Sequence, residues 1–171
     1  TGVMSLDAAA DIKTAAKHYG CQRSRRHDTP MEARLDVSKD QCPTDAEEIA
    51  AMSKRPYRGV IGTGQYFVNI RPDCQYAVSK LASFTNNPGL VHWKHALRIL
   101  THMDYSDKKM YFGTNRHNVK RHAAVRCYVD ADLAGCKDTD RSRTGIIYSA
   151  YGDIVETTSK MQKSTVNSSC H

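Results

Sequence analysis

The sequence has little that would place the protein in a membrane or outside the cell. It contains no apolar run of about 18 residues, so no transmembrane helix is expected. The first residues, Thr1-Gly2-Val3-Met4, lack the charged flank and long apolar core of a secretory signal. The chain does not begin with methionine, which suggests a segment of something longer. We therefore expect a cytoplasmic or nuclear location and no membrane partner.

Paired metal-binding cysteines are also missing. The six cysteines are scattered, no two form a Cys-x-x-Cys pair, and nearby histidines do not complete a zinc spacing. Without a secretory signal, reduced thiols are favoured over a disulfide framework. There is no internal repeat and no low-complexity stretch. Gly59, Gly62 and Gly64 do not make a Gly-x-Gly-x-x-Gly phosphate loop, because their order and context differ.

Positive charge is what the sequence has in excess. The 171 residues carry a formal net charge of +7, and 40% of them are hydrophobic. The hydrophobic fraction is enough for a folded core. The charge favours a polyanionic partner, nucleic acid first, although a soluble protein with surplus surface lysine has the same balance.

Apolar spacing predicts helices in the first two thirds of the chain. Helical stripes cover residues 6–19, 44–52, 56–68, 74–84 and 93–103, and Gly20 stands where a C-terminal capping glycine belongs. In the last of these segments, four residues lie off the apolar stripe: Lys94, His95, Arg98 and His102. The histidines could be metal ligands, but a solvated or phosphate-facing helix surface is the favoured interpretation.

The last third has the period of β-strands. Strands are predicted at 109–113, 125–130, 145–151 and 154–158, with Gly152-Asp153 as a two-residue hairpin turn. Basic residues precede the second of these strands, at Arg116, Lys120 and Arg121. The chain thus reads as α+β, with helices first and antiparallel strands last.

One motif has catalytic character. Asp130 and Asp132 are two residues apart, so they share one side of a strand, at its exposed end. Carboxylates in this arrangement suit a divalent metal, as in nucleases and polymerases. On its own the pattern is common, and a solvated strand end is the default interpretation.

The order of several short motifs resembles the Pol polyprotein of copia-type LTR retrotransposons, over roughly residues 7–171. The first part of the match comprises Thr29-Pro30-Met31-Glu32, Pro56-Tyr57-Arg58, Arg71-Pro72-Asp73, Tyr76-Ala77-Val78-Ser79-Lys80-Leu81, Asn87-Pro88 and His92-Trp93-Lys94. The second part comprises Asp130-Ala131-Asp132, Asp138-Thr139-Asp140-Arg141-Ser142, Thr144-Gly145, Ser159-Lys160, Gln162-Lys163 and Ser168-Ser169-Cys170. The resemblance implies the end of a reverse transcriptase joined to the start of an RNase H domain.

The resemblance also implies a metal site and shows where this chain departs from it. RNase H of that family holds two Mg²⁺ ions with several carboxylates, and Asp130 matches the first of these, with Asp132 as its less certain neighbour. The next carboxylate, a glutamate after Ser169-Cys170, is His171 here, and Leu133 and Thr157 stand where the family has tryptophan. Asp130 is therefore expected to be vestigial, and Mg²⁺ is not expected to bind stably to a truncated or degenerate segment.

We thus predict a helical segment at 1–107, resembling the link between polymerase and RNase H, and an incomplete RNase H-like antiparallel sheet at 108–171. The expected function is a share of reverse transcription and RNA degradation, reduced to weak backbone binding of an RNA–DNA hybrid or other nucleic acid, with the rest of Pol as partner. The binding residues would be Lys94, Arg98, Arg116, Lys120, Arg121 and Arg126. The alternatives are a non-catalytic interaction or scaffolding piece and, less favoured, an independent metal-dependent nuclease.

Overall fold

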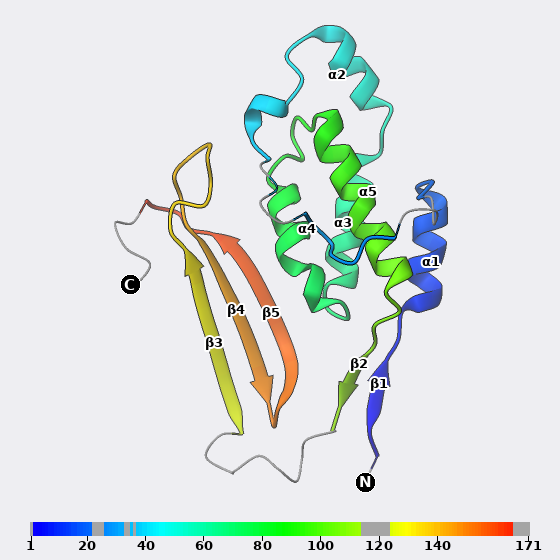
Figure 1. Cartoon of the computed structure of the whole chain (residues 1–171), viewed down its shortest axis with the longest axis vertical. Helices are drawn as coiled ribbons and strands as arrows, with labels where there is room; N and C mark the ends of the chain where they lie inside the picture. The colour runs from blue at the N-terminus through cyan, green and yellow to red at the C-terminus, as the bar shows by residue number, and fades with distance from the viewer. Residues whose placement is uncertain (1, 22–25, 33–34, 36, 114–123, 166–171) are drawn as a thin grey trace. The chain divides into compact units, whose positions relative to one another are not determined.

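The computed structural model of the chain describes residues 2–21, 26–32, 35, 37–113 and 124–165. It divides into two compact units, one formed by Ala8–Lys108 and the other by Thr1–Asp7 with Lys109–His171 (Figure 1). We call them the helical unit and the strand unit. The boundary between them falls one residue after the expected one. The first seven residues join the strand unit because β1 (Met4–Leu6) pairs antiparallel with β2 (Met110–Phe112).

The helical unit contains the helices that the apolar spacing predicted. Among the described residues they are α1 (Ala9–His18), α2 (Ala46–Ser53), α3 (Tyr57–Phe67), α4 (Gln75–Ala82) and α5 (Leu90–Tyr105), with short 3₁₀ turns at Lys39–Gln41 and Pro72–Cys74. The prediction was wrong at Leu6, which lies in β1 rather than in the first helix. The pairing of β1 with β2 takes precedence there over local helical spacing, since Leu6 aligns with Met110.

Two helix ends are set by local sequence. After α1, Gly20 adopts a φ of +70°, the Cys21 amide donates to the Ala16 carbonyl, and the Gly20 amide donates to the Lys17 carbonyl. This is a Schellman cap, as the glycine predicted. At the start of α2, the Asp45 carboxylate accepts the Glu48 amide at 2.7 Å. Asp45 is therefore the N-cap of α2.

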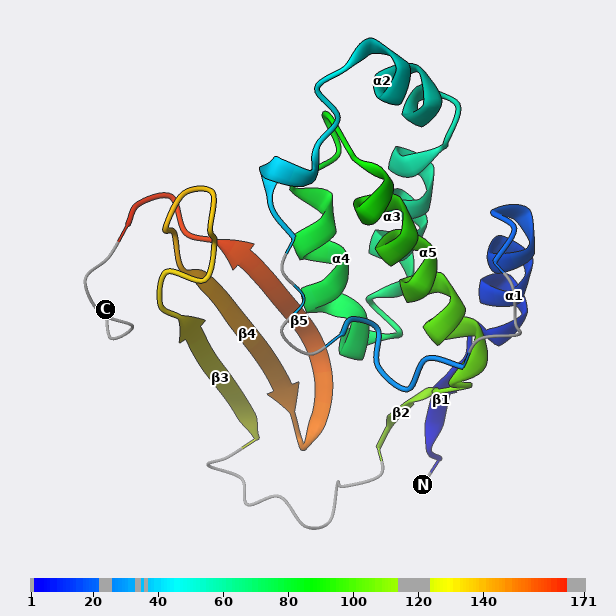
Figure 2. The same ribbon diagram turned by 45° about the horizontal axis from the view of Figure 1, so that its top comes forward.

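The core of the helical unit forms around α5. This helix contacts α1, α3 and α4, and Figure 2 shows it running beside α3 and α4. Leu81 and Leu100 are completely buried, and Val60, Val78 and Ile99 pack in the same cluster. Burying such side chains contributes roughly 25 cal/mol per Å² of apolar surface removed from water. The interleaved stripes of α3, α4 and α5 thus supply the main stabilising term of this unit.

The strand unit contains a second, three-stranded sheet. Its strands are β3 (Val125–Asp132), β4 (Arg143–Ala150) and β5 (Asp153–Met161), all antiparallel, in the order β3-β4-β5. The β4–β5 turn lies one residue earlier than predicted. Tyr151 and Gly152 have φ values of +52° and +91°, the positive pair typical of a type I′ turn, while Asp153 already belongs to β5.

This sheet buries little apolar surface. All buried apolar residues of the described chain lie in Ala8–Lys108, whereas the buried side chains of the sheet and the β3–β4 connection are Ser142, Arg143, Ser149 and Ser159. Val125 and Val129 are 74% and 63% exposed. In the described sheet, apolar side chains of β3 are thus exposed, and the sheet has two edges, at β3 and β5.

Two further findings concern the cysteines and the helices. Among the described residues, Cys21, Cys42, Cys74, Cys127 and Cys136 take part in no disulfide, and Cys170 lies outside the described residues. Within the described chain, none of the helices combines the length and apolar character that crossing a membrane requires.

Candidate functional site

The aspartate pair lies where the sequence predicted it, at the end of β3. Asp130 and Asp132 are both exposed and share one side of the strand. Asp130 pairs in register with Gly145 of β4, and its carboxylate accepts the neighbouring Ala131 amide at 2.9 Å. This leaves Asp130 as a surface carboxylate beside a position without a side chain.

Asp132 has a structural task in the connection between β3 and β4. One oxygen of its carboxylate accepts the Arg143 amide at 2.6 Å. The other lies so close to Gly135 that a Cβ there would be 2.0 Å from it. The carboxylate is therefore held inside its own loop. Both aspartates are thus exposed, and the carboxylate of each accepts one backbone amide.

The predicted nucleic-acid-binding residues fall in both units. Lys94 is exposed on α5, and Arg126 is exposed on β3. Arg98, also on α5, donates to the Glu32 carboxylate at 2.6 Å, so part of its charge is neutralised within the fold. Arg116, Lys120 and Arg121 lie outside the described residues.

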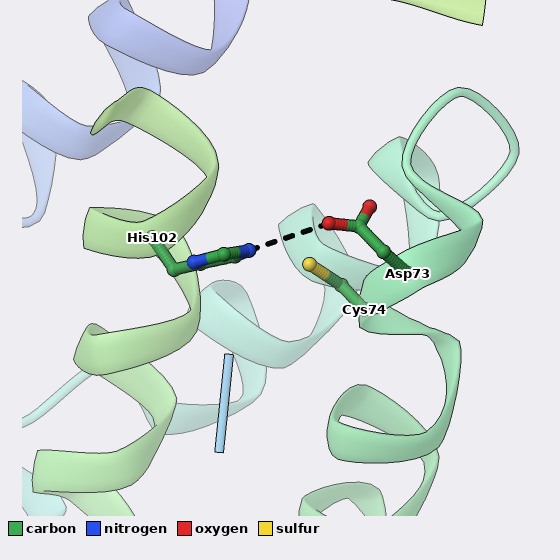
Figure 3. A group of neighbouring side chains, drawn as sticks. All are labelled: Asp73, Cys74 and His102. Atoms are coloured by element: carbon green, nitrogen blue, oxygen red, sulfur yellow. Dashed lines mark hydrogen bonds and ion pairs between the residues drawn. The ribbon is translucent and has the colours of Figure 1, made fainter. Parts of the chain in front are cut away.

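A second polar group, not predicted as a site, lies inside the helical unit. Figure 3 shows Asp73 and Cys74 facing His102, with the His102 ring directed at the Asp73 carboxylate. One candidate ligand atom from each residue lies within 4.8 Å of the others. Cys74 and His102 are buried, so the geometry alone would allow a metal centre.

The hydrogen bonds of Asp73 point to a different role. Arg71 approaches its carboxylate with two nitrogens, Nε at 3.0 Å and Nη2 at 2.9 Å. Lys108 Nζ lies 2.9 Å away, and His102 Nε2 lies 3.3 Å away. Both carboxylate oxygens are thus occupied by donors, and a metal ion would have to displace cationic side chains to reach them.

The pKa of Asp73 agrees with a role in a network of ion pairs. Burial acts to raise the pKa of Asp73, but hydrogen bonds from His102, Arg71 and Lys108 outweigh it and hold that pKa well below its usual range. Burial, aided by the nearby Asp73 charge, raises the pKa of the Cys74 thiol to about 12. A carboxylate whose two oxygens already accept from three side chains does not fit a metal site. We therefore assign Arg71, Asp73, His102 and Lys108 as a structural network.

The network joins the start of α4 to the end of α5. Arg71 is 1% exposed, and its Nη1 donates to the Met103 carbonyl at 2.9 Å. Its Nη2 also donates to Ser106 Oγ at 2.7 Å, and Ser106 caps α5. His102 Nδ1 lies 2.7 Å from the His27 carbonyl oxygen, which adds the segment after α1. Arg71 thus donates to one of the last carbonyls of α5, which have no partner within the helix.

Comparison with known proteins finds transposon Pol polyproteins among the relatives of the chain. It is 31% identical over 155 residues to the retrovirus-related Pol polyprotein from transposon TNT 1-94 of Nicotiana tabacum, covering 89% of this chain and 11% of that protein. The corresponding polyproteins from transposons RE1 and RE2 of Arabidopsis thaliana are 35% and 34% identical over 113 residues. The chain is a relative of copia-type retrotransposon Pol polyproteins. This confirms the resemblance found in the sequence.

The match covers a small part of those Pol proteins. The chain spans about a tenth of the length of the TNT 1-94 polyprotein, at 11%, and 7% and 8% of the RE1 and RE2 polyproteins. No protein-family model matches the chain, and no solved structure matches it significantly.

The structure corrects one prediction about this Pol-related chain. His102 was placed on a solvated or phosphate-facing surface because it lies off the Trp93 stripe, yet it is 1% exposed. α5 is covered on more than one side, since α1, α3 and α4 all contact it. The Arg71-x-Asp73 spacing was visible in the sequence, but its partner His102 is 29 residues from Asp73 and only the fold brings the two together.

Proposed function

We propose that the chain corresponds to the end of the reverse transcriptase and the start of the RNase H domain of a retrotransposon Pol polyprotein. The observation that carries this proposal is the 155-residue match to a transposon Pol polyprotein. Three antiparallel strands with Asp130 near the end of the first also suit an RNase H-like sheet. Such a protein would act in the cytoplasm or nucleus, with other parts of Pol and nucleic acid as partners.

We further propose that the chain by itself does not cleave RNA. Two-metal hydrolysis needs carboxylates that converge on ions roughly 4 Å apart. Asp132 is exposed, but its carboxylate already accepts the Arg143 amide, and only Asp130 matches the first metal ligand of the family. One such carboxylate does not hold two Mg²⁺ ions.

We expect the purified chain to leave an RNA–DNA hybrid intact at millimolar Mg²⁺ or Mn²⁺. The measurement is gel analysis of a labelled RNA strand over several hours. Any cleavage should be repeated with Asp130→Asn, with Asp28→Asn as a control carboxylate in the helical unit. Metal-dependent cleavage that Asp130→Asn abolishes and Asp28→Asn preserves would contradict inactivity.

The remaining activity that we propose is weak, sequence-independent binding of nucleic-acid backbone. The chain carries a formal charge of +7, and exposed Lys94 and Arg126 are in position to meet phosphate. Arg98 should contribute less, because Glu32 already accepts from it. Each phosphate contact adds about 0.7 to 0.9 to the slope of log affinity against log salt.

We expect a hybrid oligonucleotide to bind with a dissociation constant between about 1 and 100 µM at physiological salt. Replacing Arg116, Lys120, Arg121 and Arg126 with glutamine should reduce the salt slope by about 2 to 4. The matched control removes four positive charges elsewhere, at Lys13, Lys17, Lys54 and Lys137. If both variants show the same slope of log affinity against log salt, net charge alone explains the change. If the natural chain does not bind at low salt, a scaffolding piece is favoured instead.

A further inference from the structure

An open cleft lies within the helical unit, between α2, the start of α3 and the loop that joins α4 to α5. Its volume is about 340 Å³, which is at the lower end of the range for sites that bind small ligands. The described residues that line it fall in the ranges 49–59 and 85–88, and both ranges belong to the helical unit. The cleft is therefore a feature of that unit alone.

The charge of the cleft is of one sign. Arg55 and Arg58 belong to its lining, and the lining residues that the structure describes include no aspartate or glutamate. A guanidinium group stays charged under all conditions in which proteins fold, and its planar fork of donors suits phosphate oxygens. The cleft therefore favours a ligand with an anionic group, phosphate above all.

The two arginines are held in different ways. Arg58 Nε donates to the Thr85 carbonyl at 3.2 Å, and its Nη2 lies 3.4 Å from Asn86 Oδ1, so the loop orients this guanidinium. The half-buried Arg55 side chain has no hydrogen bond or ion pair to any residue that the structure describes. One positioned guanidinium and one without a partner can thus both donate to a bound anion, and the orientation of Arg58 lowers the entropic cost of binding.

Beside the arginines, the cleft offers apolar surface. This part of the lining is contributed by Ile49, Met52, Pro56 and Pro88. The hydroxyls of Ser53 and Thr85, which also line the cleft, already donate to the carbonyls of Ala50 and Ala82, at 2.8 and 2.6 Å. The ligand that fits therefore has an apolar body next to its anionic end.

We propose that the cleft binds one nucleotide of an unpaired nucleic-acid strand, with the phosphate at Arg55 and Arg58 and the base against the apolar residues. The class of ligand rests on the proposed association with nucleic acid. An unpaired base can leave its stack and lie against apolar side chains or a guanidinium plane, whereas a base in a duplex is held by its pair. Contacts of this kind accept any base, so no sequence preference is expected.

An acidic protein segment is the competing occupant, because its carboxylates would also pair with the two arginines. It fits less well, since aspartate and glutamate side chains are short and would leave the apolar part of the cleft uncovered. A nucleotide has both parts, a phosphate and a flat base. A decaglutamate peptide therefore serves as the charge-matched competitor in the test.

The test is an NMR titration of the ¹⁵N-labelled 171-residue chain with thymidine 5′-monophosphate, inorganic phosphate and thymidine in turn. We expect the monophosphate to shift the signals of Arg55, Arg58 and Asn86 and to bind at least about fivefold more tightly than phosphate or thymidine alone. Arg55→Gln should weaken binding about tenfold, the loss of a hydrogen bond to a charged group. Because Arg55 has no partner among the described residues, its replacement should leave the rest of the spectrum unchanged. Lys54→Gln is the matched control, since Lys54 is exposed and is not among the described lining residues.

Three results of this titration would overturn the proposal. Equal affinity for inorganic phosphate and the monophosphate would mean a plain anion site, and equal effects of Arg55→Gln and Lys54→Gln would mean that net charge alone is responsible. Displacement of the monophosphate by decaglutamate at lower concentration than by decathymidylate would favour an acidic protein segment.

Fluorescence anisotropy with labelled decathymidylate and with an RNA–DNA hybrid separates this proposal from the proposed backbone binding. We expect Arg55→Gln to weaken binding of decathymidylate and to leave binding of the hybrid unchanged. If the hybrid binds but Arg55→Gln does not affect decathymidylate, the cleft proposal is wrong and backbone binding stands. If the monophosphate binds in the cleft but the hybrid does not bind, the cleft proposal stands and backbone binding is wrong.

Discussion

Asp73→Asn should lower the free energy of unfolding of the helical unit by about 3 to 5 kcal/mol. The substitution leaves Arg71, 1% exposed, without the carboxylate that two of its nitrogens contact. Arg71 is the buried partner, whereas the Asp73 side chain is 27% exposed, so removing the carboxylate leaves a buried charge uncompensated, which costs more than the pair itself contributes. The new amide group would also turn a donor toward Lys108 or Arg71, where only an acceptor fits.

The sole tryptophan provides the readout, because Trp93 lies on α5 of the same unit. Urea unfolding followed by Trp93 fluorescence should show the lower free energy of unfolding of Asp73→Asn. Asp28→Asn is the matched control, since the Arg26–Asp28 pair has side chains that are 66% and 76% exposed. An exposed pair contributes at most about 1 kcal/mol. If Asp73→Asn lowers the free energy of unfolding no more than Asp28→Asn does, Asp73 does not have this role in the network.

The stability that Asp73 contributes should change with pH in a defined direction. The folded pKa of Asp73 is lower than its unfolded value, so the stabilising contribution is complete above the unfolded pKa of 3.8. It is lost as pH falls from there toward the lowered folded value. The difference in free energy of unfolding between the natural chain and Asp73→Asn should thus be constant between pH 6 and 7. It should decrease below about pH 4.

Sequence reasoning located most elements because their signals are local. The apolar stripes of α3, α4 and α5 and the alternation in β3 are short-range patterns, and each element forms close to where its pattern lies. Gly20 and the turn before β5 were found through backbone preferences of single residues. The turn was placed one residue late because Tyr151, not a typical residue for positive φ, takes its first central position.

The long-range features could not be predicted in this way. Leu6 belongs to a strand only because β2 lies 104 residues further along the chain, as the alignment of Leu6 with Met110 shows. Arg71 and His102 are polar by composition but buried by packing. The aspartate pair shows the limit of a motif: the spacing of Asp130 and Asp132 was found, but the loop that holds the Asp132 carboxylate was not.

A pair of identical substitutions separates close packing from helix propensity. Gly89 stands at the N-cap of α5, and a Cβ there would lie 1.9 Å from the Gln41 backbone oxygen. A non-bonded carbon cannot lie so close to an oxygen, and a backbone oxygen in a 3₁₀ turn cannot rotate away as the end of a side chain can. The segment ending at Gln41 or the start of α5 must move. The glycine is thus required by packing, although its φ of −90° is ordinary.

We therefore expect Gly89→Ala to destabilise the helical unit by about 3 kcal/mol, measured by urea unfolding with Trp93 fluorescence. Displacing Gly89 also disturbs the bond from its amide to His92 Nδ1, at 2.9 Å, and with it the stacking of His92 on Phe84. Gly62→Ala is the counterpart. Gly62 lies inside α3, and a Cβ there meets nothing within 4 Å.

With no steric conflict, Gly62→Ala should stabilise the chain by about 0.5 to 1 kcal/mol, because alanine loses less backbone freedom in a helix than glycine does. The test is that the two substitutions change the free energy of unfolding in opposite directions, since a general sensitivity of this unit to mutation would lower it in both variants. If Gly89→Ala changed stability by less than about 0.5 kcal/mol, the close approach of the 39–41 turn to the start of α5 would not exist in solution.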